Sequence, residues 1–122
     1  MGEPLHTRVI RKMTIREYQE DVRRTSPGYE TNTDQLYHAV FGLTSEAGEV
    51  AGILQKLYQG HELDRMHIIK ELGDCLWMIS EACDALETDL ETVMTVNVEK
   101  RKARYPDGFS ADRSLHRAEE DI

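Results

Sequence analysis

Two pairs of acidic residues, each with its members three positions apart, stand out in the sequence. They are Glu46 with Glu49 and Glu71 with Asp74. Residues three apart lie on one face of a helix, so each pair can direct two carboxylates at one point. Such oxygen ligands suit a hard divalent cation, Mg²⁺ above all, with Mn²⁺ as a possible substitute.

The position of Gly60 determines how the two pairs meet. The midpoint between Glu46 and Asp74 is position 60, and so is the midpoint between Glu49 and Glu71. A hairpin of two antiparallel helices that turns at Gly60 therefore brings all four carboxylates to one level. Two like charges about 4 Å apart repel by roughly 4 kcal/mol at an effective dielectric constant near 20, so the sequence predicts a compensating metal ion.

The alternative interpretation is that these pairs only solubilise exposed helix faces. Acidic residues are common in this chain, which has 23 of them against 15 basic residues. Three further pairs share the spacing, but none has a partner pair mirrored across a turn. We therefore assign them to solvated faces: Glu17 with Glu20, Glu81 with Asp84, and Asp84 with Glu87.

Apolar residues position the acidic pairs. They recur at alternating spacings of four and three over residues 36–57 and again over 68–86, which is typical of helices that bury one stripe. Capping-box patterns begin further helices at Thr14 and Thr88. No segment alternates as a strand does, so we predict an all-α fold: a four-to-five-helix bundle built on a central antiparallel hairpin.

The chain of 122 residues is long enough for one domain. We predict an N-terminal arm over 1–12, the helical domain over 13–109 and a polar tail over 110–122. A domain this small with long apolar stripes favours a homodimer or homotetramer. Cys75 and Cys83 show no metal-binding or disulfide pattern, and we expect them to be reduced.

Charge and hydropathy limit the partners. A net charge of -8 argues against nucleic acid as a ligand, because a phosphate backbone requires a basic surface. No apolar run is as long as a membrane span, and residues 1–12 lack the apolar core of a signal peptide, so we expect no membrane partner and a cytoplasmic protein.

Three further features invite a functional interpretation beside a structural one. The basic run from Lys100 to Arg104 ends a predicted helix, where it either complements the helix dipole or binds phosphates. Trp77 follows Asp74 by three positions, as a core residue or as a surface for stacking a base. His38 lies on nearly the same face as Glu49 and either lines the mouth of the site or is an ordinary histidine.

Three motifs together resemble the MazG-like nucleotide pyrophosphohydrolases, which belong to the all-α NTP pyrophosphohydrolases. The motifs are Glu-Ala-Gly-Glu-Val-Ala at 46–51, Lys-Glu-Leu-Gly-Asp at 70–74, and the Asn97, Lys100, Arg104, Tyr105, Pro106 pattern. The resemblance implies hydrolysis of a nucleoside triphosphate to the monophosphate and pyrophosphate. It also implies magnesium binding at the four acidic residues, and substrate contacts from Asn97, Lys100 and Arg104, often beside the acidic cluster of a neighbouring subunit.

The residue inventory agrees with this chemistry, because no Ser, Cys or His is arranged as an activated nucleophile. We expect a water activated by the metal to attack, with Glu49 as the base. The alternatives are a dUTPase-like or phosphoribosyl-ATP pyrophosphohydrolase activity, or a non-catalytic module that dimerises through its helices.

Overall fold

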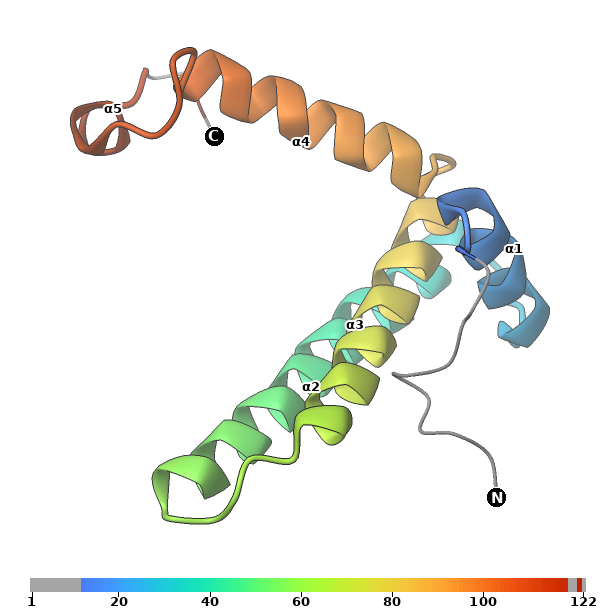
Figure 1. Ribbon diagram of the computed structural model, residues 1–122. Helices are drawn as coiled ribbons and strands as arrows, with labels where there is room; N and C mark the ends of the chain where they lie inside the picture. The colour runs from blue at the N-terminus through green and yellow to red at the C-terminus, as the bar shows by residue number, and fades with distance from the viewer. Residues whose placement is uncertain (1–11, 119–120, 122) are drawn as a thin grey trace.

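The computed structural model describes residues 12–118 and 121, so the predicted arm, apart from Lys12, lies outside the described residues. The described part contains α-helices and no strand, which confirms the predicted all-α class. Figure 1 shows the arrangement. The helices are α1 (Ile15–Thr25), α2 (Asn32–Tyr58), α3 (Arg65–Ala85), α4 (Leu90–Arg104) and α5 (Ala111–Leu115).

The antiparallel hairpin of α2 and α3 is the largest unit of the fold, as predicted (Figure 1). α2 ends just before Gly60, whose φ of 102° lies in the left-handed region that glycine adopts without strain. Asp64 caps α3 by accepting a hydrogen bond of 3.0 Å from the backbone N–H of His67. The turn therefore closes where the mirrored acidic pairs require it.

α1 and α4 pack at the end of the hairpin opposite the turn (Figure 1). The predicted capping box of α1 is present, since Thr14 and Glu17 bond each other's backbone N–H groups. The core lies where these helices meet, and its apolar members are small or medium-sized: Val22, Ala39, Cys83, Ala85 and Leu90. Both cysteines are free.

A charged residue is the largest side chain in this core. Glu81 has no exposed surface, and its Oε1 accepts hydrogen bonds from the Ser26 hydroxyl at 2.8 Å and the Tyr29 hydroxyl at 2.6 Å. Asp84 pairs with Arg23, whose Nη2 lies 2.9 Å from Oδ1. The assignment of Glu81 and Asp84 to a solvated face is wrong, because the loop between α1 and α2 and the end of α1 cover this face of α3.

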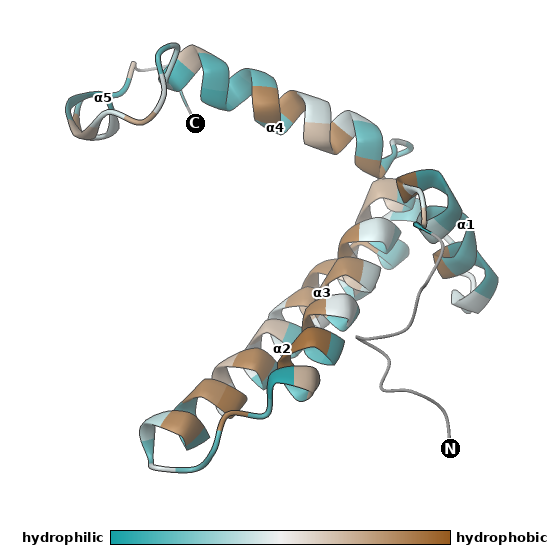
Figure 2. Cartoon of the chain, in the orientation of Figure 1, coloured by the Kyte–Doolittle hydropathy of each residue, from teal (hydrophilic) through white to brown (hydrophobic). Residues whose placement is uncertain are grey.

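Much of the apolar surface stays uncovered within one chain. Figure 2 shows hydrophobic residues along α2 and α3 and on α4, and many of the large ones are exposed. Phe41 on α2 is 68% exposed and stacks on Tyr37 with ring centroids 5.9 Å apart. Residues 91–103 of α4 are all exposed, and the helix leads away from the hairpin (Figure 1). The predicted stripes are therefore only partly buried by the chain itself.

Candidate metal centre

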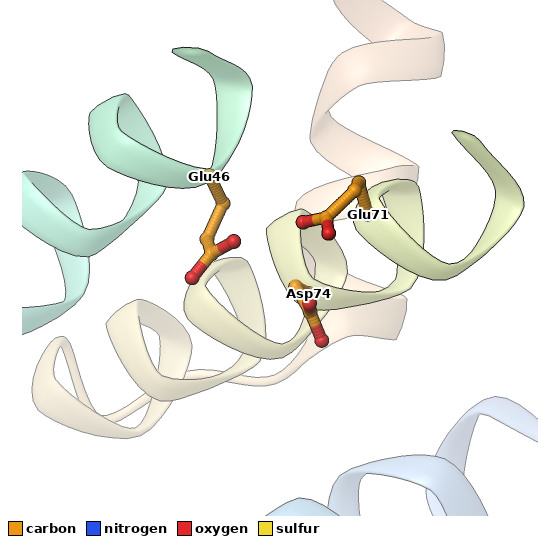
Figure 3. A group of neighbouring side chains, drawn as sticks. All are labelled: Glu46, Glu71 and Asp74. Atoms are coloured by element: carbon orange, nitrogen blue, oxygen red, sulfur yellow. The ribbon is translucent and has the colours of Figure 1, made fainter. Parts of the chain in front are cut away.

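Three of the four predicted carboxylates come together across the hairpin. Glu46 on α2 faces Glu71 and Asp74 on α3, and one oxygen of each lies within 4.8 Å of the others (Figure 3). The two α3 residues share a face because they are three apart, and the turn at Gly60 brings Glu46 to their level. Within the described residues, this is the one place where three or more potential metal ligands lie this close together.

The electrostatics of this cluster favour a bound cation. Partial burial raises the pKa of Glu46, and the negative charge of Asp74, a hydrogen bond with Glu71 and the charges of Glu71 and Glu49 raise it further. Like charges at this separation oppose ionisation, and a divalent cation reverses that effect. Three convergent carboxylates that repel one another therefore fit a hard cation with oxygen ligands.

Glu49 does not join the group, although it follows Glu46 by one turn on α2. Its side chain is exposed, and it lines an open cavity of about 540 Å³ together with Lys56, His61 and His67. His67 also approaches the cluster, with its Nε2 3.3 Å from Oε1 of Glu71. The cavity thus adjoins the carboxylates on the side of the hairpin turn.

The predicted phosphate-binding residues lie far from the cluster in the same chain. Asn97, Lys100 and Arg104 follow one another along α4, which points away from the hairpin (Figure 1). Oδ1 of Asn97 accepts a hydrogen bond of 3.0 Å from Nε of Arg101. Arg104 pairs with Asp121. One subunit does not bring these residues to the carboxylates.

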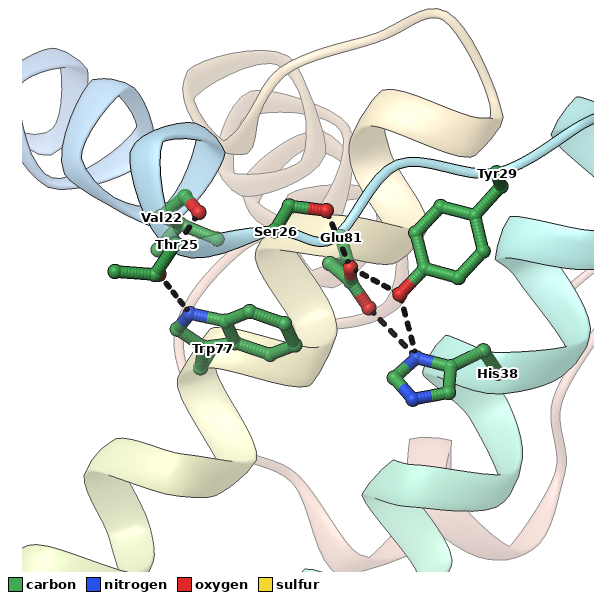
Figure 4. Close-up of polar contacts among 7 residues, drawn as sticks. All are labelled: Val22, Thr25, Ser26, Tyr29, His38, Trp77 and Glu81. Carbon is green, nitrogen blue, oxygen red and sulfur yellow. Dashed lines mark hydrogen bonds and ion pairs between the residues drawn. The ribbon is translucent and has the colours of Figure 1, made fainter.

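His38 and Trp77 lie on either side of Glu81, near the α1–α2 loop (Figure 4). Nδ1 of His38 is 3.0 Å from Oε2 of Glu81 and 2.9 Å from the Tyr29 hydroxyl. Nε1 of Trp77 donates a hydrogen bond of 2.9 Å to the Thr25 hydroxyl. Both side chains thus have structural partners, and neither contacts the carboxylate cluster.

Tyr18 is a neighbour of the cluster that the sequence prediction missed. Its hydroxyl donates to the backbone oxygen of Gly73 at 3.4 Å. Burial raises the pKa of Tyr18, and the nearby charges of Asp74 and Asp21 raise it further. The sequence signals only an apolar helix position here, because nothing local to α1 shows that it crosses α3 at Gly73.

A comparison with protein families supplies the decisive observation, since the model of the MazG nucleotide pyrophosphohydrolase domain matches residues 36–109. The chain belongs to the MazG family. The match includes α2 from residue 36 onward, α3 and α4, and hence the whole carboxylate cluster and the residues Asn97, Lys100 and Arg104. The resemblance found from the motifs is confirmed.

A known protein is also similar to this MazG-family chain. The Gene 37 protein of Mycobacterium phage L5 is 30% identical over 78 residues, which cover 60% of this chain and 68% of the phage protein. No solved structure gives a significant match. Among the described residues, no helix is both long and apolar enough to cross a membrane.

Proposed function

We propose that this MazG-family protein hydrolyses nucleoside triphosphates, including deoxynucleotides, to the monophosphate and pyrophosphate with Mg²⁺ as its cofactor. The observation that carries the proposal is the convergence of Glu46, Glu71 and Asp74 across the hairpin, inside the region that matches the family. Charge compensation and positioning are most of what phosphoryl transfer requires of a protein. The activity serves the nucleotide pool in this proposal.

The metal ligands in this proposal are Glu46, Glu71 and Asp74, with Glu49 as a fourth ligand or as the base. A divalent cation bound there neutralises charge on the substrate phosphates and lowers the pKa of water. Mn²⁺ has similar ligand preferences and is expected to substitute. His67, 3.3 Å from Glu71, orients that carboxylate.

The exposure of Glu49 supports its role as the base. It follows Glu46 on the same helix, yet it lies outside the group of three. A carboxylate that is not fully committed to the cation is free to accept a proton from the attacking water. The cavity that Glu49 lines gives the water access to it.

The phosphate tail requires cations that the hairpin does not supply. Lys100 and Arg104, with Asn97 one turn before Lys100, are suited to contact phosphates and sugar. Because α4 carries them away from the cluster of its own chain, we infer that they serve the cluster of a second copy in a homodimer or homotetramer (Figure 1). The exposed apolar residues of α2 and α4 would be covered by the same contact.

The base and sugar are expected on the side of His38 and Trp77. Eight positions separate His38 from Glu46 on α2, which corresponds to about 12 Å along the helix. A substrate held by its phosphates at the carboxylates extends in one direction along the hairpin. The exposed edge of His38 is suited to a hydrogen bond with a base, and the Trp77 ring to stacking.

The test is pyrophosphate release from a panel of ribonucleoside and deoxynucleoside triphosphates and phosphoribosyl-ATP, with and without Mg²⁺. We expect release that requires the cation and is lost in Asp74→Asn. Preference for dUTP or phosphoribosyl-ATP would identify one of the two related activities instead. No release from any substrate by a folded protein would support a non-catalytic helical module.

A further inference from the structure

A basic cavity lies at the end of α4, outside the carboxylate cluster. It has a volume of about 350 Å³ and is bounded by the last turn of α4 and by the segment that contains α5. Four of its lining side chains are cationic, although the chain as a whole carries a net charge of -8. These are Lys100, Arg104, Arg113 and Arg117.

An anionic group already occupies part of this cavity. The carboxylate of Asp121 binds the Arg104 guanidinium through two hydrogen bonds, 2.7 Å from Nε and 2.6 Å from Nη2. The two side chains are only 13% and 16% exposed. A bidentate pair that is largely shielded from water is stronger than an ordinary surface ion pair.

Other cations of the cavity act on the same carboxylate. The hydrogen bonds from Arg104 lower the pKa of Asp121, and the charges of Arg104, Arg117 and Lys100 lower it further. Lys100, Arg104 and Arg117 therefore all act on the point where the carboxylate lies, and Arg113 lines the same cavity. His116, also in the lining, pairs instead with Asp112 at 3.2 Å.

In the part of the chain that the structure describes, a single carboxylate faces four cations in this cavity. Among the described residues, Asp121 is the acidic member of the lining, and no ion pair involves Lys100, Arg113 or Arg117. A phosphate or pyrophosphate group brings more negative charge and more acceptor oxygens than a carboxylate, and guanidinium groups bind it through the same bidentate geometry. A phosphate or pyrophosphate group is therefore better matched to this cavity than the carboxylate of Asp121.

We propose that Arg113 and Arg117 complete a phosphate-binding site with Lys100 and Arg104, and that Asp121 is an internal competitor which a phosphate group displaces from Arg104. The site takes phosphate groups, either of the nucleotide or of free pyrophosphate. It rests on the proposed function only in that Lys100 and Arg104 bind substrate phosphates there. Arg113, Arg117 and Asp121 lie beyond the residues that match the family.

The test is calorimetric titration of the full chain with inorganic pyrophosphate, with EDTA present so that the carboxylate cluster holds no metal. Asp121→Asn is expected to bind pyrophosphate about tenfold more tightly, because removing a competitor raises the fraction of binding-competent protein. Arg113→Ala and Arg117→Ala are each expected to weaken binding by about tenfold, the effect of losing a charged hydrogen-bond donor.

Matched controls separate this effect from a change in net charge. Asp107→Asn removes the same charge from the loop between α4 and α5, outside the cavity lining, and Lys102→Ala removes a cation of α4 that pairs with Glu99 outside the cavity. Neither is expected to change pyrophosphate binding. Asp121→Ala removes the carboxylate without leaving an amide in its place, and it should reproduce the tighter binding if Asp121→Asn perturbs the local fold.

A second titration distinguishes the two sources of phosphate. A non-hydrolysable triphosphate analogue that binds as pyrophosphate does, and that gains equally from Asp121→Asn, indicates that the site takes nucleotide. If Asp121→Asn raises the affinity for pyrophosphate alone, the site takes the free product. Unchanged binding of both ligands in Asp121→Asn and in Asp121→Ala, or in both arginine variants, would overturn the proposal.

Failure of this proposal and failure of the proposed function give different results. If the protein binds pyrophosphate as described but hydrolyses no nucleotide, the proposed site is supported and the proposed function is contradicted. The opposite result is a protein that hydrolyses nucleotides in a way that depends on Asp74, while changes at Asp121, Arg113 and Arg117 alter neither pyrophosphate binding nor KM. That result supports the proposed function and contradicts the proposed site.

Discussion

The hydroxyl of Tyr29 donates a hydrogen bond of 2.6 Å to Oε1 of Glu81, a carboxylate with no exposed surface (Figure 4). Ser26 donates to the same oxygen, and His38 lies 3.0 Å from the other. These partners come from the α1–α2 loop and from α2, whereas Glu81 belongs to α3. This one carboxylate therefore joins three parts of the chain.

We predict that Glu81→Gln destabilises the fold by about 2–3 kcal/mol, the typical cost of losing charge-assisted hydrogen bonds and leaving a buried polar group unsatisfied. The glutamine amide has the same shape, but its oxygen is uncharged, and if that oxygen accepts from the two hydroxyls its NH2 group must face Nδ1 of His38. Urea unfolding provides the measurement. Glu20→Gln, on the exposed face of α1, is the control and should stay within about 0.5 kcal/mol of the parent. An equally small effect for Glu81→Gln would refute the buried network.

Local sequence signals predicted the elements that local physics determines. The caps at Thr14 and Asp64 and the turn at Gly60 depend on residues within one helical turn of each other. The hairpin geometry followed from these signals, and with it the approach of Glu46 to Glu71 and Asp74.

The errors concern contacts between distant segments. Glu81 and Glu20 both belong to acidic pairs spaced three apart, yet only Glu81 is covered by the α1–α2 loop. The sequence pattern of α3 does not predict where that loop packs against the helix. Glu49 has the predicted helical phase relative to Glu46, but helical phase does not determine its rotamer, and its side chain lies outside the group of three. Tyr18 was missed for the same reason as Glu81.

Divalent cations are expected to stabilise the protein through the carboxylate cluster. Mg²⁺ or Mn²⁺ should raise the melting temperature as ln(1 + [L]/Kd), because only the folded chain brings Glu46, Glu71 and Asp74 together. Glu46→Gln or Asp74→Asn should abolish both this rise and turnover. The metal-free variants should be at least as stable as the parent, since a repelling charge is gone.

Thermal unfolding followed with increasing Mg²⁺ makes the measurement. Glu20→Gln is again the control, with an unchanged response to the cation. Glu49→Gln is informative because the side chain lies outside the group of three: we expect a larger loss in kcat than in cation affinity. A normal cation response in both Glu46→Gln and Asp74→Asn would mean that the cluster holds no metal.

His38 and Tyr29 offer a matched pair that tests substrate binding near Glu81. Both contact this carboxylate, but the imidazole is half exposed and the Tyr29 hydroxyl is committed to the network. If His38 contacts the base or sugar, His38→Ala raises KM by about tenfold, whereas Tyr29→Phe leaves KM within about twofold. Steady-state kinetics with the best substrate of the panel decides this. Equal changes in both variants, matching equal losses of stability, would assign His38 a purely structural role.

The separation of Lys100 from Asp74 leads to a prediction about subunits. Both residues lie in the family-matched region, but α4 carries Lys100 away from the hairpin of its own chain (Figure 1). Exposed apolar residues, including Phe41 on α2 and Val96 at 62% exposure on α4, are suited to an interface. We therefore expect sedimentation velocity to show a homo-oligomer, and Phe41→Glu or Val96→Glu to shift it toward monomer with loss of activity.

Complementation tests whether the active site is shared between copies. Asp74→Asn and Lys100→Ala chains should each be nearly inactive alone, because each lacks one half of every site. When they are co-expressed as a dimer, one of the two sites in each mixed pair receives both intact residues, and about a quarter of parental activity should return. Lys102→Ala in place of Lys100→Ala is the control and keeps full activity alone. The contrary result is that the two variants form mixed oligomers whose activity is no greater than the sum of the activities of the separate variants. That result would show that each chain completes its own site.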